Sequence, residues 1–475
     1  MNKLTRAAIP AVLFLACASA PPATAAVAVT DDPVLYWNQL MLDTVPGSGA
    51  IRTYAMMNIA MYDSLNATLG YRNASYLTGV SSFGGIGGVA AVQAAHDILA
   101  STNPGAIAQY DAALSASLAQ FADGAGKTNG IATGQAYAAA MITNRANDGA
   151  FASVTYTPSG LPGGYAPTPP GFGSPIFPQW GDVTPFLLDS PEQFRAPPPP
   201  ELTSAAYADA VNEVKAIGWA DSATRTADQT AAAQFWSTAN GSTYMRLGLE
   251  ITADEGLSTF ENARLFSLLG AGIADTLITL WDTKYHYDLW RPVTAIQNAD
   301  LDGNPLTEAD ADWQSLIAAP AHPSYVSAHS ALGAMVTGIL LDNIDDQAFC
   351  STIGPNTRCW SSLDAISIDG SSSRLWGGIH FDFDRDAGLT MGAQIASWEV
   401  SRATFNAVPE PATWQMMMIG AGLIGWALRR RGKLIVRMPA ANSRRAPWTH
   451  HDAFSPDAGD DRDLATADGR GRRLP

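Results

Sequence analysis

Three separated clusters of basic and hydrogen-bonding residues could together bind and attack a tetrahedral oxyanion. They read KYHYDLWRP at 284–292, HPSYVSAH at 322–329 and SRLWGGIHFDFD at 373–384. Each cluster combines a histidine with cations or hydroxyl groups, in a chain whose net charge is −16. Fixed cations and N–H or O–H donors can hold the oxygens of an anion, while imidazoles attack its central atom or move protons. These residue types therefore predict a catalytic anion-binding site.

The two cations of the first cluster have a spacing that suits a helix. Lys284 and Arg291 are seven residues apart, so on one helix they would share a face, about 10 Å apart along the axis. Pro292 predicts that this helix ends at Arg291. A lone cation is more often a solvated surface group, but this pair together with Arg374 favours anion binding.

The second and third clusters place histidines beside groups that could orient them or an anion. Ser327-Ala328-His329 directly precedes an apolar run at helical spacing, which predicts a helix whose first backbone N–H groups face the anion. Asp384 follows His380 by one helical turn and could fix the tautomer of its imidazole. An isolated His–Asp pair at this spacing is usually only a satisfied polar contact, so the catalytic interpretation depends on the surrounding motif.

The three clusters resemble the signature of the superfamily of vanadium-dependent haloperoxidases and type 2 phosphatidic acid phosphatases. That signature runs Lys, six residues, Arg-Pro; then Pro-Ser-Gly-His; then Ser-Arg, five residues, His, three residues, Asp. The first and third parts match at every defined position, whereas Val326 replaces the proline and Ala328 the glycine of the middle part. The stretches 54–66 and 167–188 are similar to bacterial haloperoxidases. The resemblance therefore covers roughly residues 31–405.

The resemblance implies a role for each matching residue. The residues that it implies for oxyanion binding are Lys284, Arg291, Ser327, Ala328 through its amide, Arg374 and His380. His380 would be the axial ligand of vanadium in vanadate, or in a phosphatase the nucleophile that carries the phosphoryl group. His329 would be the general acid–base group, and Asp384 would orient His380. Vanadate and phosphate share shape and charge, so either could occupy the site. Alanine at position 328 keeps the N–H but adds a methyl group where glycine allows close approach, which predicts a tighter or distorted pocket.

A third histidine of the clusters bears on the choice of halide. His322 lies seven residues before His329, and bromoperoxidases of the family resemble this in an HPSYPSGH-like run, whereas chloroperoxidases have an aromatic residue there. The resemblance favours bromide and a catalytic His322; a helix-entry histidine without catalytic contact is the alternative. The histidines without such context, expected to be structural or to lie in the C-terminal tail, are His96, His286, His450 and His451.

Three functions remain open for this set of residues. The resemblance favours a secreted vanadium-dependent haloperoxidase that oxidises halide with hydrogen peroxide and delivers it to a small organic acceptor. An acid phosphatase that works through a phosphohistidine is the first alternative. A catalytically inactive surface or matrix protein is the second, and Ala328 motivates it. A membrane-embedded lipid phosphatase is not expected, because residues 27–408 contain no set of apolar stretches like membrane spans.

The elements that carry the clusters are predicted to be helical nearly throughout. Residues 265–280 are apolar almost all round, as in a central buried helix, and apolar residues repeat at helical spacing in 326–340 and 387–398. Further alanine-rich segments predicted as helices are 86–100, 106–121, 131–145 and 203–216. No series of alternating strands is evident, so we expect an all-α protein, a large helical bundle of the haloperoxidase and acid phosphatase type over residues 27–405. The Pro/Gly-rich loop 157–200 should cover the mouth of the active site or wrap the bundle.

Composition and the N-terminal residues bear on compartment and partners. A chain of 475 residues with 47% hydrophobic content can bury a large core in one or two packed domains, and its acidic balance disfavours nucleic acid as a partner. Residues 1–26 resemble a secretory signal peptide, because an apolar run follows two cations and ends at small residues; a lipoprotein modified at Cys17 is the weaker alternative. In an oxidising compartment Cys350 and Cys359 are predicted to form a disulfide, with free thiols as the alternative.

The C-terminal region contains a second targeting pattern. Residues 408–431 begin with VPEP, continue with an apolar stretch at 412–428 and end with three arginines. This pattern resembles the PEP-CTERM sorting signal of Gram-negative bacteria, which implies processing by an exosortase-type enzyme and delivery to the periplasm, cell surface or extracellular matrix. Before processing, its hydrophobic helix would hold the chain in the membrane with the arginines on the cytoplasmic side. A plain tail anchor or a buried core helix is the alternative, and residues 432–475 are predicted to be disordered.

Overall fold

The computed structural model describes residues 27–29, 31–45, 47 and 50–405, with side chains up to Arg402. The chain divides into two units, Met1–Glu410 and Pro411–Pro475, and all described residues belong to the first. The expected features that lie outside the described residues are the signal peptide at 1–26 with Cys17, the sorting segment at 408–431, and the tail at 432–475 with His450 and His451.

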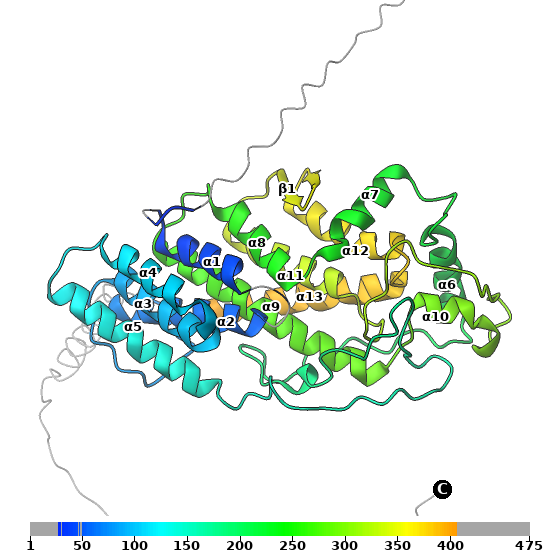
Figure 1. Ribbon diagram of the computed structural model, residues 1–475, viewed down its shortest axis with the longest axis horizontal. Coiled ribbons are helices and arrows are strands. Elements are labelled where there is room, and N and C mark those ends of the chain that lie inside the picture. Colours follow the sequence, from blue (N-terminus) through cyan, green and yellow to red (C-terminus); the bar gives the residue numbers. More distant parts are fainter. Residues whose placement is uncertain (1–26, 30, 46, 48–49, 406–475) are drawn as a thin grey trace, which may run out of the picture. The chain divides into compact units, whose positions relative to one another are not determined.

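Helices make up most of the described part (Figure 1), as the all-α prediction requires. The α-helices are α1 (Pro33–Thr44), α2 (Ile51–Thr68), α3 (Gly87–Thr102), α4 (Ile107–Leu118), α5 (Ala125–Asn144), α6 (Ala205–Ile217), α7 (Ala227–Phe235), α8 (Gly241–Thr252), α9 (Thr259–Tyr287), α10 (Pro292–Gln297), α11 (Ala328–Asn343), α12 (Leu363–Trp376) and α13 (Asp382–Phe405). Short 3₁₀ helices are η2 (Pro104–Ala106), η3 (Trp180–Asp182), η4 (Trp236–Thr238) and η5 (Ala299–Leu301). The four alanine-rich segments are α3, α4, α5 and α6, with ends that differ by a few residues from the prediction.

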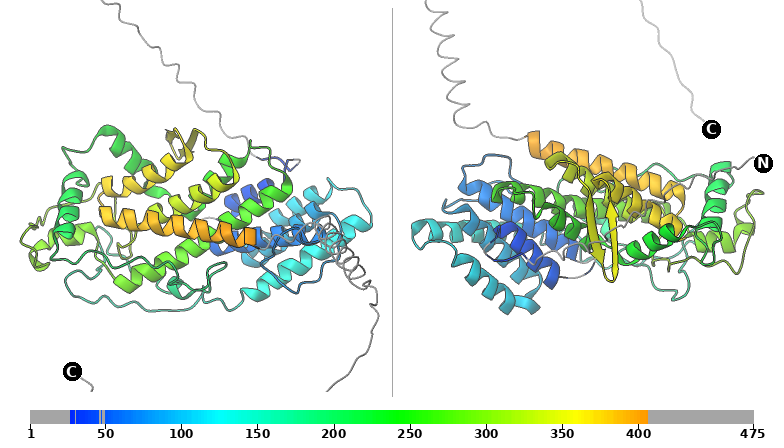
Figure 2. Two further views of the ribbon diagram at one scale, coloured as in Figure 1. Left: turned by 180° about the vertical axis from the view of Figure 1, so that it is seen from behind. Right: turned by 90° about the horizontal axis from the view of Figure 1, so that it is seen from above.

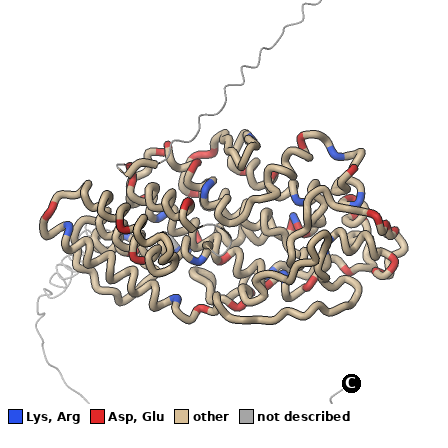
Figure 3. The backbone as a smooth tube through the Cα atoms, in the orientation of Figure 1, with Lys and Arg blue, Asp and Glu red and all other residues tan. Residues whose placement is uncertain are grey.

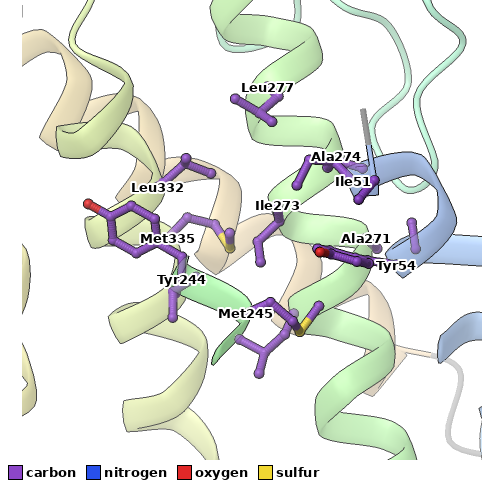
Figure 4. Close-up of a cluster of buried hydrophobic side chains, with 14 of the residues drawn as sticks. Ile51, Tyr54, Tyr244, Met245, Ala271, Ile273, Ala274, Leu277, Leu332 and Met335 are labelled. Atoms are coloured by element: carbon purple, nitrogen blue, oxygen red, sulfur yellow. The ribbon is translucent and has the colours of Figure 1, made fainter. Parts of the chain in front are cut away.

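Helix α9 is the central element of the bundle. It starts at the N-cap Ser258, which forms a capping box with Glu261, and the helices α2, α8, α11 and α13 all pack against it. Apolar side chains from α2, α8, α9 and α11 meet in one cluster (Figure 4). By length and composition α9 could cross a membrane, but 94% of its apolar window is buried inside the protein. It is therefore a core helix, as predicted for residues 265–280.

The helices gather in two groups along the long direction of the unit. Helices α1–α5 lie at one end and α6 and α10 at the other, while α9, α11 and α13 extend between them (Figures 1 and 2). Helices α11 and α13 approach very closely because α13 carries glycines where they meet. A Cβ on Gly392 would lie 2.1 Å from the carbonyl oxygen of Ala331, and one on Gly388 would lie 2.7 Å from that of Ser327. This contact places the start of α13 beside the start of α11.

A two-stranded hairpin was not anticipated from the sequence. Strands β1 (Phe349–Ile353) and β2 (Asn356–Trp360) pair antiparallel, with Cys350 opposite Cys359. These two cysteines form a disulfide, which confirms the predicted pairing. The hairpin packs against α7 and α12, near the top of the view in Figure 1.

The Pro/Gly-rich segment both wraps the bundle and reaches the site. Asp275 of α9 accepts hydrogen bonds from the backbone N–H groups of residues 186–188, at 2.6, 2.7 and 3.0 Å. Arg195 adds a two-point ion pair with Asp282, in which both N–O distances are 2.6 Å. In the same segment, Ile176, Phe177 and Trp180 line the cavity described below. The segment therefore wraps the bundle, and the cover over the active site stays a prediction.

Candidate active site

The first cluster does not lie on one helix, contrary to our expectation. Helix α9 ends at Tyr287, where Asp288 adopts a left-handed conformation with φ of 52°. Arg291 is then the N-cap of α10, and Pro292 is the first residue of that helix. The turn between the helices brings the guanidinium of Arg291 towards the last turn of α9, where Lys284 is fully buried. The two cations therefore meet through a chain reversal rather than through helical spacing.

The second cluster starts a helix as predicted. Ser327 is the N-cap of α11, and its hydroxyl accepts from the backbone N–H of Ser330 at 3.4 Å. The backbone N–H groups of Ala328 and His329 have no hydrogen-bond acceptor among the described residues. This is expected for the first turn of a helix. Ala328 has no positive φ, so its methyl group narrows the cavity without distorting the backbone.

Backbone carbonyls hold the two cations of the first cluster from one side. Lys284 donates through Nζ to the carbonyl oxygens of Pro323 and Ser324, at 2.9 and 2.7 Å. Arg291 donates through Nε to the carbonyl oxygen of His322 at 2.8 Å and through Nη1 to that of Ile379 at 2.9 Å. These contacts fix both side chains without neutralising either charge.

The third cation is held by a residue far away in the sequence. Arg374 donates through Nη1 to the carbonyl oxygen of Trp236 at 3.0 Å, and Nε2 of His329 lies 3.0 Å from the same oxygen. Since a carbonyl oxygen only accepts, Nε2 of His329 carries the proton and Nδ1 is left as a base. The Nε atom of Arg374 is buried and has no hydrogen-bond partner among the described residues, so this guanidinium retains an unused donor.

Hydrogen bonds on both sides fix the tautomer of His380. Its Nδ1 lies 2.7 Å from Oδ2 of Asp384, which also accepts from the hydroxyl of Ser324 at 2.5 Å. Its Nε2 lies 3.2 Å from Nη1 of Arg291, and a guanidinium can only donate. The proton of the neutral ring is therefore on Nδ1, and the lone pair of Nε2 is directed towards the cations. The predicted His380–Asp384 contact is present.

The electrostatic balance of the site is strongly positive. None of the three cations forms an ion pair within the described part of the chain, and Asp384 is the carboxylate that acts on Lys284 and Arg291. Burial and the charge of Arg291 lower the pKa of Lys284 well below its usual value. Burial also lowers the pKa of Arg291 to about 9 and that of Arg374 to about 10. An anion beside them would reverse these shifts, because a nearby opposite charge favours the charged form.

The histidines of the site are electrically neutral. Burial, followed by the charges of Arg291 and Lys284, lowers the pKa of His380 well below its usual value. Burial and the charge of Arg374 do the same to the pKa of His329. Burial raises the pKa of Asp384 to about 6, although the hydrogen bond from Ser324 opposes this shift. Neutral imidazoles can supply the lone pairs that attack or proton transfer requires.

A cavity of about 230 Å³ opens onto Arg374, His329 and His380, whereas Lys284, Arg291 and Asp384 do not line it. Its charged and polar lining consists of Ser237, Asn240, His322, His329, Arg374 and His380. Its apolar lining consists of Ile176, Phe177, Trp180, Ala239, Gly241, Leu277, Trp281, Pro320, Ala328 and Leu332. His322 therefore lies in the cavity; it meets the ring of Trp281 edge to face at 4.9 Å, and its Nδ1 is 2.8 Å from Nη2 of Arg291. A mixed polar and apolar lining of this kind suits a small ligand.

A larger cavity of the described part lacks the groups for this chemistry. It has about 340 Å³ and lies between Tyr62, Leu188 and Arg402, with no histidine in its lining. His96 lies elsewhere, between Asp97 and Asp111, and His286 packs against Tyr287. Neither contributes to the lining of the 230 Å³ cavity. Acidic residues predominate over the tube in Figure 3, so the three buried cations are a local exception.

Sequence reasoning missed three contributors to the site. Trp236 acts through its carbonyl oxygen, and neither its residue type nor its position predicts that. Ser324 lies inside the second cluster, where its proximity to His322 was a usable signal. Trp281 precedes Lys284 by three residues, so helical spacing could have placed it on the same side of α9.

Comparisons with known proteins show which family the region of the three clusters resembles. Residues 264–407 match the family described as the VCPO second helical-bundle domain, and all three clusters lie within them. The chain carries a vanadium chloroperoxidase-type helical-bundle domain. Residues 407–431, next to this domain, match the PEP-CTERM protein-sorting motif, which confirms the resemblance of the C-terminal region and indicates export from a Gram-negative cell.

The known proteins similar to this chain either match only part of its length or have a low sequence identity to it. Vanadium chloroperoxidase of Curvularia inaequalis is 28% identical over 193 residues, which is 34% of this chain and 31% of that protein. The match therefore spans about a third of the relative's length. A bacterial vanadium-dependent iodoperoxidase superposes with a TM-score of 0.65 at 20% identity, over 79% of this chain and 96% of that one. The holo form of a bacterial vanadium-dependent chloroperoxidase gives 0.59 at 16% identity, over 77% and 94%. These structures show that the fold is shared.

Proposed function

We propose that this protein is an exported vanadium-dependent haloperoxidase, which oxidises halide with hydrogen peroxide and delivers it to a small organic acceptor. The observation that carries the proposal is the set of three buried cations whose charges act on the unprotonated Nε2 of His380. Lys284 and Arg291 are fully buried and Arg374 is 5% exposed, yet none has an ion-pair partner within the described residues. Buried charges require compensation, and a multiply charged anion would provide it.

The donor set fits vanadate better than a bare metal cation. Among the residues that the structure describes, no cluster of three or more His, Cys, Asp or Glu side chains could hold a metal ion. The unused Nε donor of Arg374 and the free amides at the start of α11 suit the oxygens of an oxyanion instead. Phosphate has the same shape and charge and should compete for the same groups.

Each residue of the site has a proposed role. The oxyanion would be held by Lys284, Arg291, Ser327, the amide of Ala328, Arg374 and Nε2 of His380. Asp384 keeps the proton on Nδ1 of His380, and His329 moves a proton through its free Nδ1. Bound vanadate would supply the activation of peroxide for transfer of an oxygen atom to halide. His322 places a polar ring beside Trp281, and we propose bromide as the preferred halide on its resemblance to bromoperoxidases.

The effect of vanadate tests the reaction type. We expect bromide oxidation by the purified mature domain to require added vanadate and peroxide, with phosphate as a competitive inhibitor. If His380 is instead a nucleophile, the protein should hydrolyse phosphate esters without vanadate, and vanadate should inhibit it. Phosphatase activity without bromide oxidation would overturn the proposal, and neither activity would favour an inactive surface protein.

A variant of the proposed acid–base residue provides a second test. Replacing His329 by Ala should lower activity by about 10²- to 10⁴-fold, because a positioned proton donor or acceptor contributes that much. His96→Ala is the matched control, since His96 is bonded only to Asp97 and Asp111 and should leave activity unchanged. Equal effects of the two substitutions would contradict the assignment.

We also propose that both ends of the chain are processed. Residues 1–26 would be removed on export, residues 27–405 would form the catalytic domain, and the sorting segment 408–431 would be processed by an exosortase-type enzyme. The mature protein would then act in the periplasm, at the cell surface or in the matrix, without residues 432–475. Mass spectrometry of the native protein should show that both ends are missing. An intact cytoplasmic chain that ends at Pro475 would refute the proposed processing.

A further inference from the structure

One backbone carbonyl holds two residues of the proposed site at once. The carbonyl oxygen of Trp236 accepts from Nη1 of Arg374 and from Nε2 of His329, each at 3.0 Å. The position of this oxygen therefore sets both the direction of one cation and the tautomer of one base. Trp236 is the first residue of the short helix η4, so a single helical turn provides little rigidity of its own.

The indole of Trp236 is anchored on two sides. Its Nε1 donates to Oδ2 of Asp369 at 2.8 Å, and its ring stacks on Tyr244 with centroids 5.7 Å apart and an interplanar angle of 19°. Tyr244 in turn donates its hydroxyl proton to the carbonyl oxygen of His329 at 3.0 Å. The fully buried indole is thus tied to α12 through Asp369 and to the start of α11 through Tyr244.

Asp369 is itself held by the disulfide-closed hairpin. Arg358 of β2 donates to both of its oxygens, from Nε at 2.9 Å and from Nη2 at 2.7 Å. Trp360 donates from Nε1 at 3.2 Å. Asp369 therefore accepts from two indoles and one guanidinium, and the side chains of this ion pair are only 15% and 11% exposed. The Cys350–Cys359 disulfide closes the hairpin next to Arg358.

We infer that Asp369 is a positioning residue, which fixes the Trp236 carbonyl and through it Arg374 and His329. The hairpin and its disulfide form the outer support of this unit, and the chain Arg358–Asp369–Trp236 connects them to the cavity. The inference extends the proposed function, because it assigns the support of the oxyanion site to residues outside the three clusters. If the role of Asp369 were purely structural, its replacement would lower the stability of the fold but leave the geometry of His329 and Arg374 unchanged.

Substitutions that remove single hydrogen bonds of this unit test the inference. Asp369→Asn keeps the size of the side chain but removes its charge and turns one acceptor into a donor that faces Trp236 or Arg358. Trp236→Phe keeps an aromatic ring and removes the Nε1 donor. Asp63→Asn is the matched control, because Asp63 is also a buried carboxylate and accepts from the backbone of Tyr76 and Leu77 in a separate part of the bundle.

Two readouts besides activity separate positioning from stability. Phosphate and vanadate affinities, measured by calorimetry on the folded proteins, should fall about 10- to 100-fold in Asp369→Asn, the usual effect of removing a supporting partner. In ¹⁵N spectra of histidine-labelled protein, the wild type should show His329 protonated at Nε2, and the variant should show a mixture of tautomers. Asp63→Asn should lower the melting temperature without moving either readout.

The outcomes are decisive in each case. Unchanged affinity or an unchanged His329 tautomer in Asp369→Asn would overturn the inference. If that variant fails to fold, Arg358→Lys removes one of the two hydrogen bonds and should give a smaller shift of the same kind; no shift there would overturn the inference too. If the wild type binds neither oxyanion, the proposed function fails, and the His329 tautomer alone then decides the positioning role.

Discussion

The middle and the C-terminal end of helix α9 both carry buried charge, but only the charge in the middle is satisfied by the chain's own hydrogen bonds. Near its end, Lys284 lies within electrostatic reach of Arg291, and Asp384 is the carboxylate that acts on both cations. In its middle, Asp275 is fully buried but accepts three backbone N–H groups. The chain thus satisfies the buried anion with its own donors and leaves the buried cations with capacity for a ligand. Burial alone therefore does not distinguish a structural charge from a functional one; the unused hydrogen-bonding capacity does.

A second carboxyl group near Asp275 extends the contrast. Glu399 of α13 is fully buried, and neither of its side-chain oxygens has a hydrogen-bond partner among the described residues. Burial, followed by the charge of Asp275, raises the pKa of Glu399 well above its usual value. Burial raises the pKa of Asp275 to about 6, although its three amide donors oppose the shift. The middle of α9 is thus suited to a neutral Glu399, whereas the end of α9 is suited to an external anion.

The largest expected effect is the loss of oxyanion binding on removal of one cation. Arg374→Ala should weaken vanadate and phosphate affinity by more than about 100-fold, because a charge-assisted donor is lost from a buried site. The helical fold should remain, since the side chain of Arg374 donates to Trp236 alone among the described residues. Calorimetry and circular dichroism would measure the two effects. An unchanged vanadate and phosphate affinity would mean that Arg374 is structural, and the contrast between the end and the middle of α9 would then fail.

Replacing Asp275, whose charge is satisfied by backbone donors, should lower stability and leave oxyanion affinity nearly unchanged. Asp275→Ala leaves three buried amides of residues 186–188 without an acceptor and should reduce the free energy of unfolding by about 3 kcal/mol. Oxyanion affinity should stay within about threefold of the wild type, since Asp275 does not itself line the cavity. Urea unfolding and calorimetry on the same samples would test this. A large loss of affinity with no loss of stability would reverse the assignment of the two regions.

The raised pKa of Glu399 should make the stability of the fold depend on pH. A carboxyl group with a raised folded-state pKa binds more protons in the folded state, so stability falls as pH rises from about 4.5 through the raised value. Glu399→Gln resembles the protonated form and should match the wild type near pH 5, then exceed its stability slightly at pH 8 to 9. Thermal unfolding across this range measures the difference. Identical profiles for both proteins would show that Glu399 does not titrate on unfolding.

The sequence indicated residues that the structure brings close together around His380, but not all the contacts that hold them there. The three clusters carry types and spacings that the chemistry requires, and α11 begins at Ser327 as its apolar periodicity indicated. The pairing of Lys284 with Arg291 was wrong in its geometry, because a left-handed residue at Asp288 ends the helix early and spacing does not reveal that.

The unpredicted parts depend on contacts between distant segments. Trp236 contributes a backbone carbonyl, which every residue possesses, so no residue type marks it. The hairpin at 349–360 is short, and its strands are stabilised by a disulfide and by Arg358 rather than by a strong alternating pattern. Periodicity finds long amphipathic helices, whereas such tertiary contacts have no local signal.

The smallest expected effect concerns the residue that departs from the family signature. Ala328 is the first residue of α11, and its methyl group lines the cavity beside His329. Because alanine and glycine both supply the N–H and no positive φ is needed here, Ala328→Gly should change oxyanion affinity by less than about tenfold, or about 1.4 kcal/mol. Calorimetry with vanadate, and bromide oxidation where it is present, measure the change. If the wild type is inactive and Ala328→Gly restores activity by orders of magnitude, one methyl group rather than the balance of buried charges would decide function at this end of α9.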